Sequence, residues 1–121
     1  MKILLVDDST TMRRIQKNTL EKLGFTDITE AGDGAEALGK LAGGGFDLVL
    51  MDWNMPNMTG IEALKKIKAD PVLKAVPVIM VTSESEKSRI MEAIQAGAAN
   101  YLVKPFQAEV LQEKISAVLK K

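Results

Sequence analysis

The chain has 121 residues, and its 16 lysines and arginines balance 16 aspartates and glutamates. This length suits one domain with a proper core, and the charge balance gives no reason to expect nucleic acid or an anionic membrane as a partner. Since the chain has no cysteine or histidine, disulfides, thiolate zinc, cysteine catalysis and a Ser-His-Asp triad are all excluded.

The amino terminus resembles a signal peptide only briefly. An apolar run at residues 3–6 is followed at once by Asp7 and Asp8, and then by Arg13 and Arg14. This leaves no long apolar core before a small-residue cleavage site. No apolar run approaches the ~20 residues of a membrane span. We therefore expect a cytoplasmic protein without a membrane segment.

Two strand–helix pairs are expected first. The apolar run at residues 3–6 predicts a buried strand, and the helix after it extends to Leu23 and stops at Gly24. A weaker strand follows at residues 25–31, and a short helix covers residues 35–41. The apolar residues at helical spacing in the first helix are Met12, Ile15, Leu20 and Leu23.

The third pair begins after a triple glycine at residues 43–45. We interpret these glycines as a loop, because a phosphate cradle would follow a strand and open a helix, whereas these glycines end a helix. The third strand, residues 48–51, is wholly apolar and stops at Asp52. After a loop rich in Asn, Pro and Gly, a third helix over residues 61–68 ends before an Asp-Pro pair.

The last two pairs complete the pattern. A fourth apolar strand is expected at residues 76–81, followed by a helix that Gly97 stops. A short fifth strand at residues 101–103 precedes an amphipathic helix over residues 108–119. The inner face of the fourth helix is expected to consist of Ile90, Met91 and Ile94.

Strands and helices thus alternate about five times with short links. This alternation predicts a parallel sheet with right-handed crossovers and helices on both faces. No linker, repeat or low-complexity segment suggests a second domain. The sequence therefore predicts a single doubly wound α/β domain over residues 1–121.

Polar residues follow four of the five expected strands, and the carboxyl ends of parallel strands lie along one edge of the sheet. These residues are Asp7 and Asp8, Asp52, Thr82 and Ser83, and Lys104. Each has a structural interpretation alone, since Asp8 or Thr82 could cap a helix and Lys104 could be solvated. Three neighbouring carboxylates, however, need a cation or raised pKa values. An oxygen-only site suits Mg²⁺, with Mn²⁺ as a substitute.

Four segments together resemble the receiver domain of bacterial response regulators. They are residues 6–9 (VDDS), 51–60 (MDWNMPNMTG), 81–84 (VTSE) and 104–106 (KPF). The resemblance covers essentially the whole chain and is greatest to the chemotaxis regulators, through residues 9–14, 52–54 and Tyr101. It implies a flavodoxin-like three-layer α/β/α fold with strand order 2-1-3-4-5 and no output domain.

The resemblance also implies a role for each residue at the strand ends. Asp52 would accept a phosphoryl group from a histidine kinase, with Thr82 and Lys104 binding the phosphoryl oxygens. A cis peptide between Lys104 and Pro105 would aim the ammonium. The implied Mg²⁺ ligands are Asp7, which can act through water, Asp8 as a direct ligand, Asp52, and the main-chain carbonyl of Asn54.

A conformational switch is the further implication of the resemblance. Thr82 would move inward on phosphorylation, and Tyr101 would rotate into the space vacated. From spacing alone, Tyr101 is instead a half-buried strand aromatic. The implied partner surface consists of Ser85, Tyr101, Val103 and Lys114.

The partners implied are a CheA-like histidine kinase, a flagellar motor switch protein and a phosphatase, and we expect the regulator to be a monomer. A phosphorelay intermediate that passes phosphate to a histidine phosphotransferase is the alternative within the family. An aspartate-nucleophile phosphatase is more distant, because it needs an acid two residues after Asp52, where this chain has Asn54. A flavin mononucleotide binder is disfavoured, because Asp7 and Asp8 would repel its phosphate.

Overall fold

The computed structural model describes residues 1–53, 55, 58–82, 87–103 and 106–119. Its strands are β1 (Lys2–Val6), β2 (Asp27–Ala31), β3 (Leu48–Asp52), β4 (Val78–Thr82) and β5 (Asn100–Val103). Its helices are α1 (Thr10–Lys22), α2 (Gly34–Leu41), α3 (Gly60–Ala69), α4 (Lys87–Gln95) and α5 (Ala108–Leu119). A short 3-10 helix, η1 (Leu73–Ala75), was not expected from the sequence.

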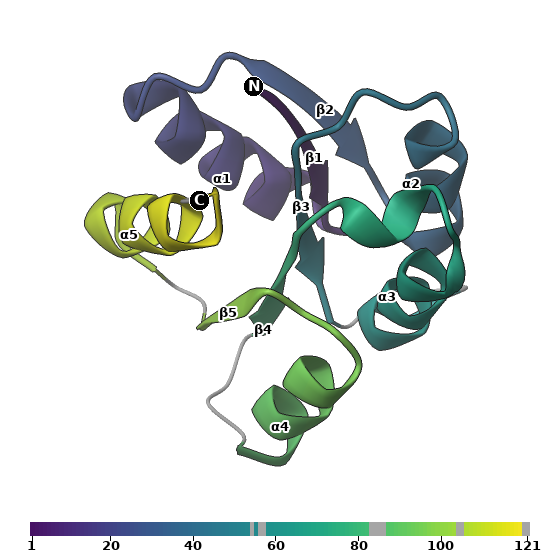
Figure 1. The fold of residues 1–121 in the computed structure, drawn as a ribbon. Coiled ribbons are helices and arrows are strands. Elements are labelled where there is room, and N and C mark those ends of the chain that lie inside the picture. Colours follow the sequence, from purple (N-terminus) through teal and green to yellow (C-terminus); the bar gives the residue numbers. More distant parts are fainter. Residues whose placement is uncertain (54, 56–57, 83–86, 104–105, 120–121) are drawn as a thin grey trace.

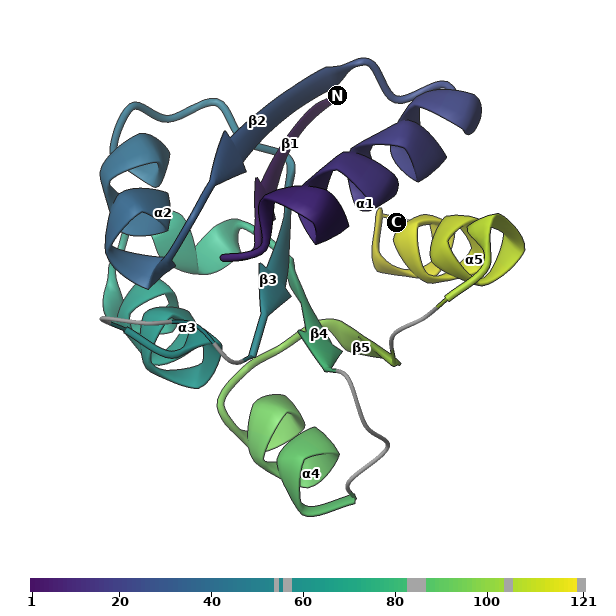
Figure 2. The same ribbon diagram turned by 180° about the vertical axis from the view of Figure 1, so that it is seen from behind.

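The five strands form one parallel sheet in the order β2-β1-β3-β4-β5. Figures 1 and 2 show α1 and α5 on one face of this sheet and α2 and α3 on the other. The expected doubly wound fold and the strand order 2-1-3-4-5 are therefore confirmed.

Alternate residues of the central strands pack into two separate hydrophobic cores, one on each face of the sheet. Leu4 and Val49 face the cluster that includes α2, α3 and Ala93 of α4. Leu5 and Leu50 face the cluster that includes α1 and α5. All five residues of β3 are buried, as are those of β4, so the central strands read as continuous apolar runs.

Polar caps begin the helices that border the carboxyl edge of the sheet. The Ser9 hydroxyl accepts a hydrogen bond from the Met12 N–H at 3.2 Å and caps α1. Thr59 and Glu62 form a reciprocal capping box at the start of α3. These caps fix the directions in which the chain leaves β1 and enters α3.

The predicted inner face of α4 is wrong for Met91 and Ile94, whereas Ile90 is partly buried and lines an apolar space together with Ala93. Met91 is 60% exposed and Ile94 is 49% exposed, whereas the small residue Ala93 is buried. Ala93 is the residue of α4 that belongs to the buried core cluster, and Met91 and Ile94 lie to either side of it in solvent.

The apolar stripe expected in α1 also fails at one position. Ile15 is 52% exposed, while its neighbour Gln16 is 3% exposed and Leu20 is fully buried. The buried side of α1 therefore includes a polar residue, which contacts the site described next.

Candidate metal and phosphorylation site

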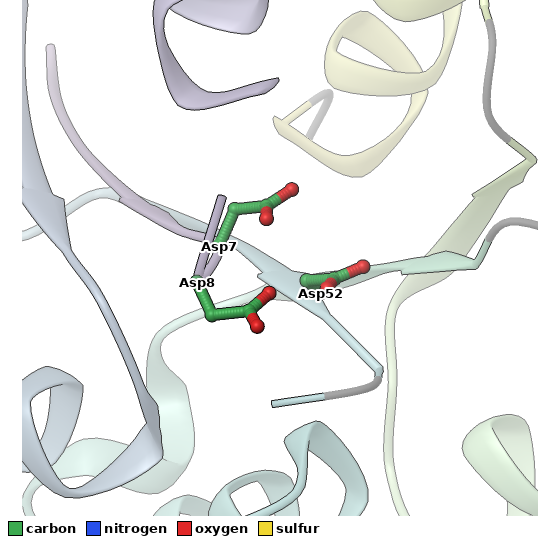
Figure 3. A group of neighbouring side chains, drawn as sticks. All are labelled: Asp7, Asp8 and Asp52. Atoms are coloured by element: carbon green, nitrogen blue, oxygen red, sulfur yellow. The ribbon is translucent and has the colours of Figure 1, made fainter. Parts of the chain in front are cut away.

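Three carboxylates converge at the carboxyl edge of the sheet. Asp7 and Asp8 follow β1, and Asp52 ends β3; the register pairs Val6 with Met51, so Asp7 lies beside Asp52. One oxygen from each side chain lies within 4.8 Å of those of the other two. Figure 3 shows the three side chains directed to the same side of the strands.

The three acids differ in exposure. Asp7 and Asp52 are buried, whereas Asp8 is exposed. Carboxylates this close repel one another in a partly desolvated setting, and a cation is the simplest way to offset that repulsion. The set fits a hard divalent cation that binds oxygen and keeps part of its water shell, since Asp8 leaves one side open to solvent.

Asp7 accepts several hydrogen bonds that hold it in place. Its Oδ1 accepts a hydrogen bond from the Ser9 N–H at 2.9 Å, and its Oδ2 accepts one from Gln16 Nε2 at 3.2 Å. The guanidinium of Arg13 donates to the main-chain carbonyl of Asp7 at 2.5 Å and also binds Glu30 at 3.1 Å. The backbone and the carboxylate of Asp7 are thus both fixed.

The backbone of Asp52 lies close to Gly60, the first residue of α3. The Gly60 N–H donates to the carbonyl of Trp53 at 2.8 Å, and the Trp53 N–H donates to that of Val81 at 3.0 Å. A Cβ on Gly60 would lie 2.0 Å from the carbonyl oxygen of Asp52. No side chain fits at this position, so glycine is required where α3 begins against the end of β3.

Thr82 lies on the strand next to Asp52. It is the last residue of β4, 3% exposed, and follows Val81, whose partner in the ladder is Asp52. Tyr101 of β5 is the partner of Met80 and is half-buried. Thr82 and Tyr101 therefore lie along the same end of the sheet, on adjacent strands.

A narrow apolar space lies between Thr82, Tyr101 and α4. The other residues that line it are Trp53, Met80, Arg89, Ile90 and Ala93. The guanidinium of Arg89 lies 5.6 Å from the centre of the Trp53 ring, a cation–π distance. The residue after the phosphoacceptor candidate is thus in contact with α4.

The predicted partner residues Tyr101, Val103 and Lys114 line one shallow, mainly apolar groove of about 290 Å³ between β5 and α5. Lys114 Nζ lies 4.6 Å from the centre of the Tyr101 ring and donates to Asn100 Oδ1 at 3.1 Å. Lys114 of α5 thus contacts both Asn100 and Tyr101 of β5.

Several predicted site residues lie outside the described part of the chain. They are Asn54, Ser83, Ser85, Lys104 and Pro105. Within the described residues, no helix is both long and apolar enough to cross a membrane.

Three residues of this region were not singled out from the sequence. Gln16 was hidden because a polar residue on a helix is ordinarily assigned to the solvent side. The sequence pattern places Gly60 in the loop before the third helix and gives no signal for Arg89. Only a three-dimensional neighbour distinguishes each of them: Asp7 for Gln16, Asp52 for Gly60 and Trp53 for Arg89.

Comparison with known proteins agrees with this geometry. A model of the response regulator receiver domain matches residues 3–116. The chain is 54% identical over 121 residues to the chemotaxis protein CheY of Pseudomonas aeruginosa, covering 100% of this chain and 98% of the relative. It is 53% identical to CheY-3 of Vibrio cholerae, covering 100% of this chain and 93% of the relative.

Solved structures give the same result. Chemotaxis protein CheY4 of Vibrio cholerae superposes with a TM-score of 0.89 at 38% identity, covering 98% of both chains. The receiver domain of a histidine kinase from Syntrophus aciditrophicus superposes with a TM-score of 0.87 at 30% identity, covering 98% of this chain and 89% of the other. The family model and the full-length relatives, together with the three carboxylates at the sheet edge, show that this chain belongs to the response regulator receiver family.

Proposed function

We propose that this protein is a stand-alone response regulator that a histidine kinase phosphorylates on Asp52 in a Mg²⁺-dependent reaction. Phosphorylation would change its affinity for a partner, and the output would be chemotaxis through the flagellar motor switch. The observation that carries the proposal is the group of three carboxylates around Asp52 in a chain similar over its full length to chemotaxis regulators.

The phosphoryl transfer needs an acceptor oxygen at a fixed position. A carboxylate oxygen of Asp52 attacks the phosphorus, the phosphorus–nitrogen bond of the kinase phosphohistidine breaks, and the histidine leaves with its electron pair. The pairing of β3 with β4 and the close packing of the start of α3 against its backbone would restrain Asp52 during this step. Fixed geometry of this kind is a large part of the rate of phosphoryl transfer.

Asp7, Asp8 and Asp52 would hold Mg²⁺, with the carbonyl of Asn54 as a further ligand. When bound, the cation neutralises charge that develops on the phosphoryl oxygens. The residue that would supply a second positive charge is Lys104, and the hydroxyl of Thr82 would donate a hydrogen bond to the same group. Mn²⁺ has similar ligand preferences and would substitute.

The switch would run through Thr82 and Tyr101. Burial of Thr82 beside Asp52, and the shared apolar space with Tyr101, give a short physical route from the phosphoryl group to β5. The end of this route is the groove that Tyr101, Val103 and Lys114 line, and Ser85 would belong to the same partner surface. We expect a cytoplasmic monomer whose partners are the kinase, the motor switch protein and a phosphatase.

Binding of a motor switch peptide, with and without phosphorylation, tests the output. The proposal expects the affinity to rise when Asp52 carries a phosphoryl group. If phosphorylation leaves the peptide affinity unchanged and the group moves instead to a histidine phosphotransferase, the protein is a relay intermediate. Steady release of phosphate from outside phosphomonoesters over many turnovers would point to a phosphatase and contradict the proposal.

A further inference from the structure

Gln16 is a buried polar side chain in the first helix. It is 3% exposed and lies on the side of α1 that also buries Leu20. An amide removed from water costs free energy unless it is hydrogen-bonded, so its contact is informative. The Nε2 of Gln16 donates to Oδ2 of Asp7 at 3.2 Å.

This contact completes the restraint on the Asp7 carboxylate. Oδ1 accepts from the Ser9 N–H, which fixes one oxygen relative to the start of α1. With Gln16 on Oδ2, each carboxylate oxygen has a donor from a different part of α1 or its cap. Rotation of the carboxylate about its Cβ–Cγ bond would break one of these two bonds. A carboxylate can accept more than one interaction at each oxygen, so these two donors do not by themselves exclude a cation or its water.

Restraint of a carboxylate matters differently for different cations. Mg²⁺ requires nearly ideal octahedral geometry, whereas Ca²⁺ accepts variable ligand number and flexible geometry. A rigid carboxylate therefore favours Mg²⁺, and a carboxylate free to turn loses that preference. Groups behind the metal ligands commonly change metal affinity in this way.

We propose that Gln16 is a positioning residue that holds Asp7 in the orientation Mg²⁺ needs and so sets the preference of the site for Mg²⁺ over Ca²⁺. This inference rests on the cation site of the proposed function. Gln16 suits the task because its amide is a neutral donor. A lysine at the same place would add a positive charge beside the cation and weaken its binding.

The test compares cation binding in the wild-type protein and in Gln16→Met, which keeps the length and burial of the side chain but removes the donor. Calorimetry on the unphosphorylated protein gives the Kd for Mg²⁺ and for Ca²⁺ separately. We expect Mg²⁺ to bind about tenfold more weakly in the variant. The Ca²⁺ affinity should change less, so the ratio of the Ca²⁺ Kd to the Mg²⁺ Kd should fall by roughly threefold or more.

Leu20→Ala is the matched control, because Leu20 is fully buried in the same helix and belongs to the core cluster on that face. This substitution should lower thermal stability but leave the ratio of the two Kd values unchanged. The inference is overturned if Gln16→Met keeps the wild-type ratio, or if Leu20→Ala lowers the ratio equally.

A second measurement covers the case in which Gln16→Met does not fold. In the wild-type protein, the side-chain amide resonances of Gln16 should shift on addition of Mg²⁺ and shift less with Ca²⁺; equal shifts, or none, contradict the inference. Failure of the wild-type protein to bind Mg²⁺ at all would refute the proposed function. Normal Mg²⁺ binding with no effect of Gln16 would refute this inference alone.

Discussion

Replacement of Gly60 by alanine should damage both folding and phosphorylation. The added Cβ would lie 2.0 Å from the carbonyl oxygen of Asp52 and 2.9 Å from its carbonyl carbon. Contacts under 3.0 Å essentially do not occur, so the oxygen and the Cβ must separate by at least 1.0 Å. Both atoms are fixed by backbone, and neither belongs to a flexible side chain that could turn away.

The size of the effect follows from that displacement. Overpacking of a well-packed interior typically costs about 1–3 kcal/mol, and a clash between backbone atoms belongs at the upper end. A shift of about 1 Å at a reacting group can also slow a reaction about 100-fold. We therefore expect Gly60→Ala to lose about 3 kcal/mol of unfolding free energy and most of its phosphorylation rate.

Urea unfolding and the rate of phosphorylation by acetyl phosphate measure the two effects. Gly39→Ala is the matched control, because Gly39 lies inside α2 and a Cβ there meets nothing within 4 Å. That variant should gain roughly 0.5–1 kcal/mol, since alanine is the better helix former. If Gly60→Ala is as stable and reacts as fast as the wild type, the close approach of α3 to Asp52 is wrong.

Four further predictions concern the surroundings of the site. Thr59→Ala should lose about 1 kcal/mol of stability in urea unfolding, because the helix cap is lost, while Thr59→Ser should not. In the wild type, hydrogen bonds from Thr59, first from its main-chain N–H and then from its hydroxyl, lower the pKa of Glu62 below the ordinary value of 4.5. The ionised Glu62 therefore stabilises the folded protein fully above pH 4.5, and this stabilisation is lost as the pH falls through the lowered folded pKa. An NMR titration should therefore find the pKa of Glu62 below 4.5 in the wild type and closer to 4.5 in Thr59→Ala. Arg89→Gln should change the emission of Trp53 and cost about 0.5–1 kcal/mol, because it removes the cation over the indole; an unchanged spectrum would contradict that contact. Lys104→Ala should leave Mg²⁺ binding nearly unchanged in calorimetry but uncouple phosphorylation from binding of the motor switch peptide, and normal coupling would refute its assigned role.

The fold could be predicted because its signals are local and repeated. Apolar runs such as residues 48–51 fill strands buried on both faces, and Gly24 and Gly97 end helices with positive φ values of 97° and 107°. Strand boundaries were less accurate. Val76 was assigned to β4, but its N–H binds the carbonyl of Leu73 in the turn that ends η1.

The site was predictable in part, for a topological reason. Once the sheet is parallel, the residues after its strands must meet at one edge, and Asp7, Asp8 and Asp52 do meet there. What supports them could not be read in the same way. Gln16 approaches Asp7 because it lies on the buried side of α1, and hydrophobic periodicity assigns a polar residue to the solvent side.

The prediction of the inner face of α4 was inaccurate for a related reason. Apolar spacing makes Met91 and Ile94 core candidates, although the side of α4 that is covered carries Ile90 and Ala93. The exposed Met91 and Ile94 belong to an element that also contacts Trp53 through Arg89. Local patterns predict which segments are helical, whereas the rotation of a helix against the sheet decides which side chains are covered.

Phosphorylation of the purified protein by acetyl phosphate with Mg²⁺ tests the central claim most directly. Intact mass spectrometry should show one added phosphoryl group, and the emission of Trp53, adjacent to Asp52, should change over the same time course. Asp52→Asn should show neither change, and omission of Mg²⁺ should suppress both. Addition of the phosphoryl group to Asp52→Asn at the wild-type rate, or no addition to the wild type, would contradict the assignment of Asp52 as the phosphoacceptor.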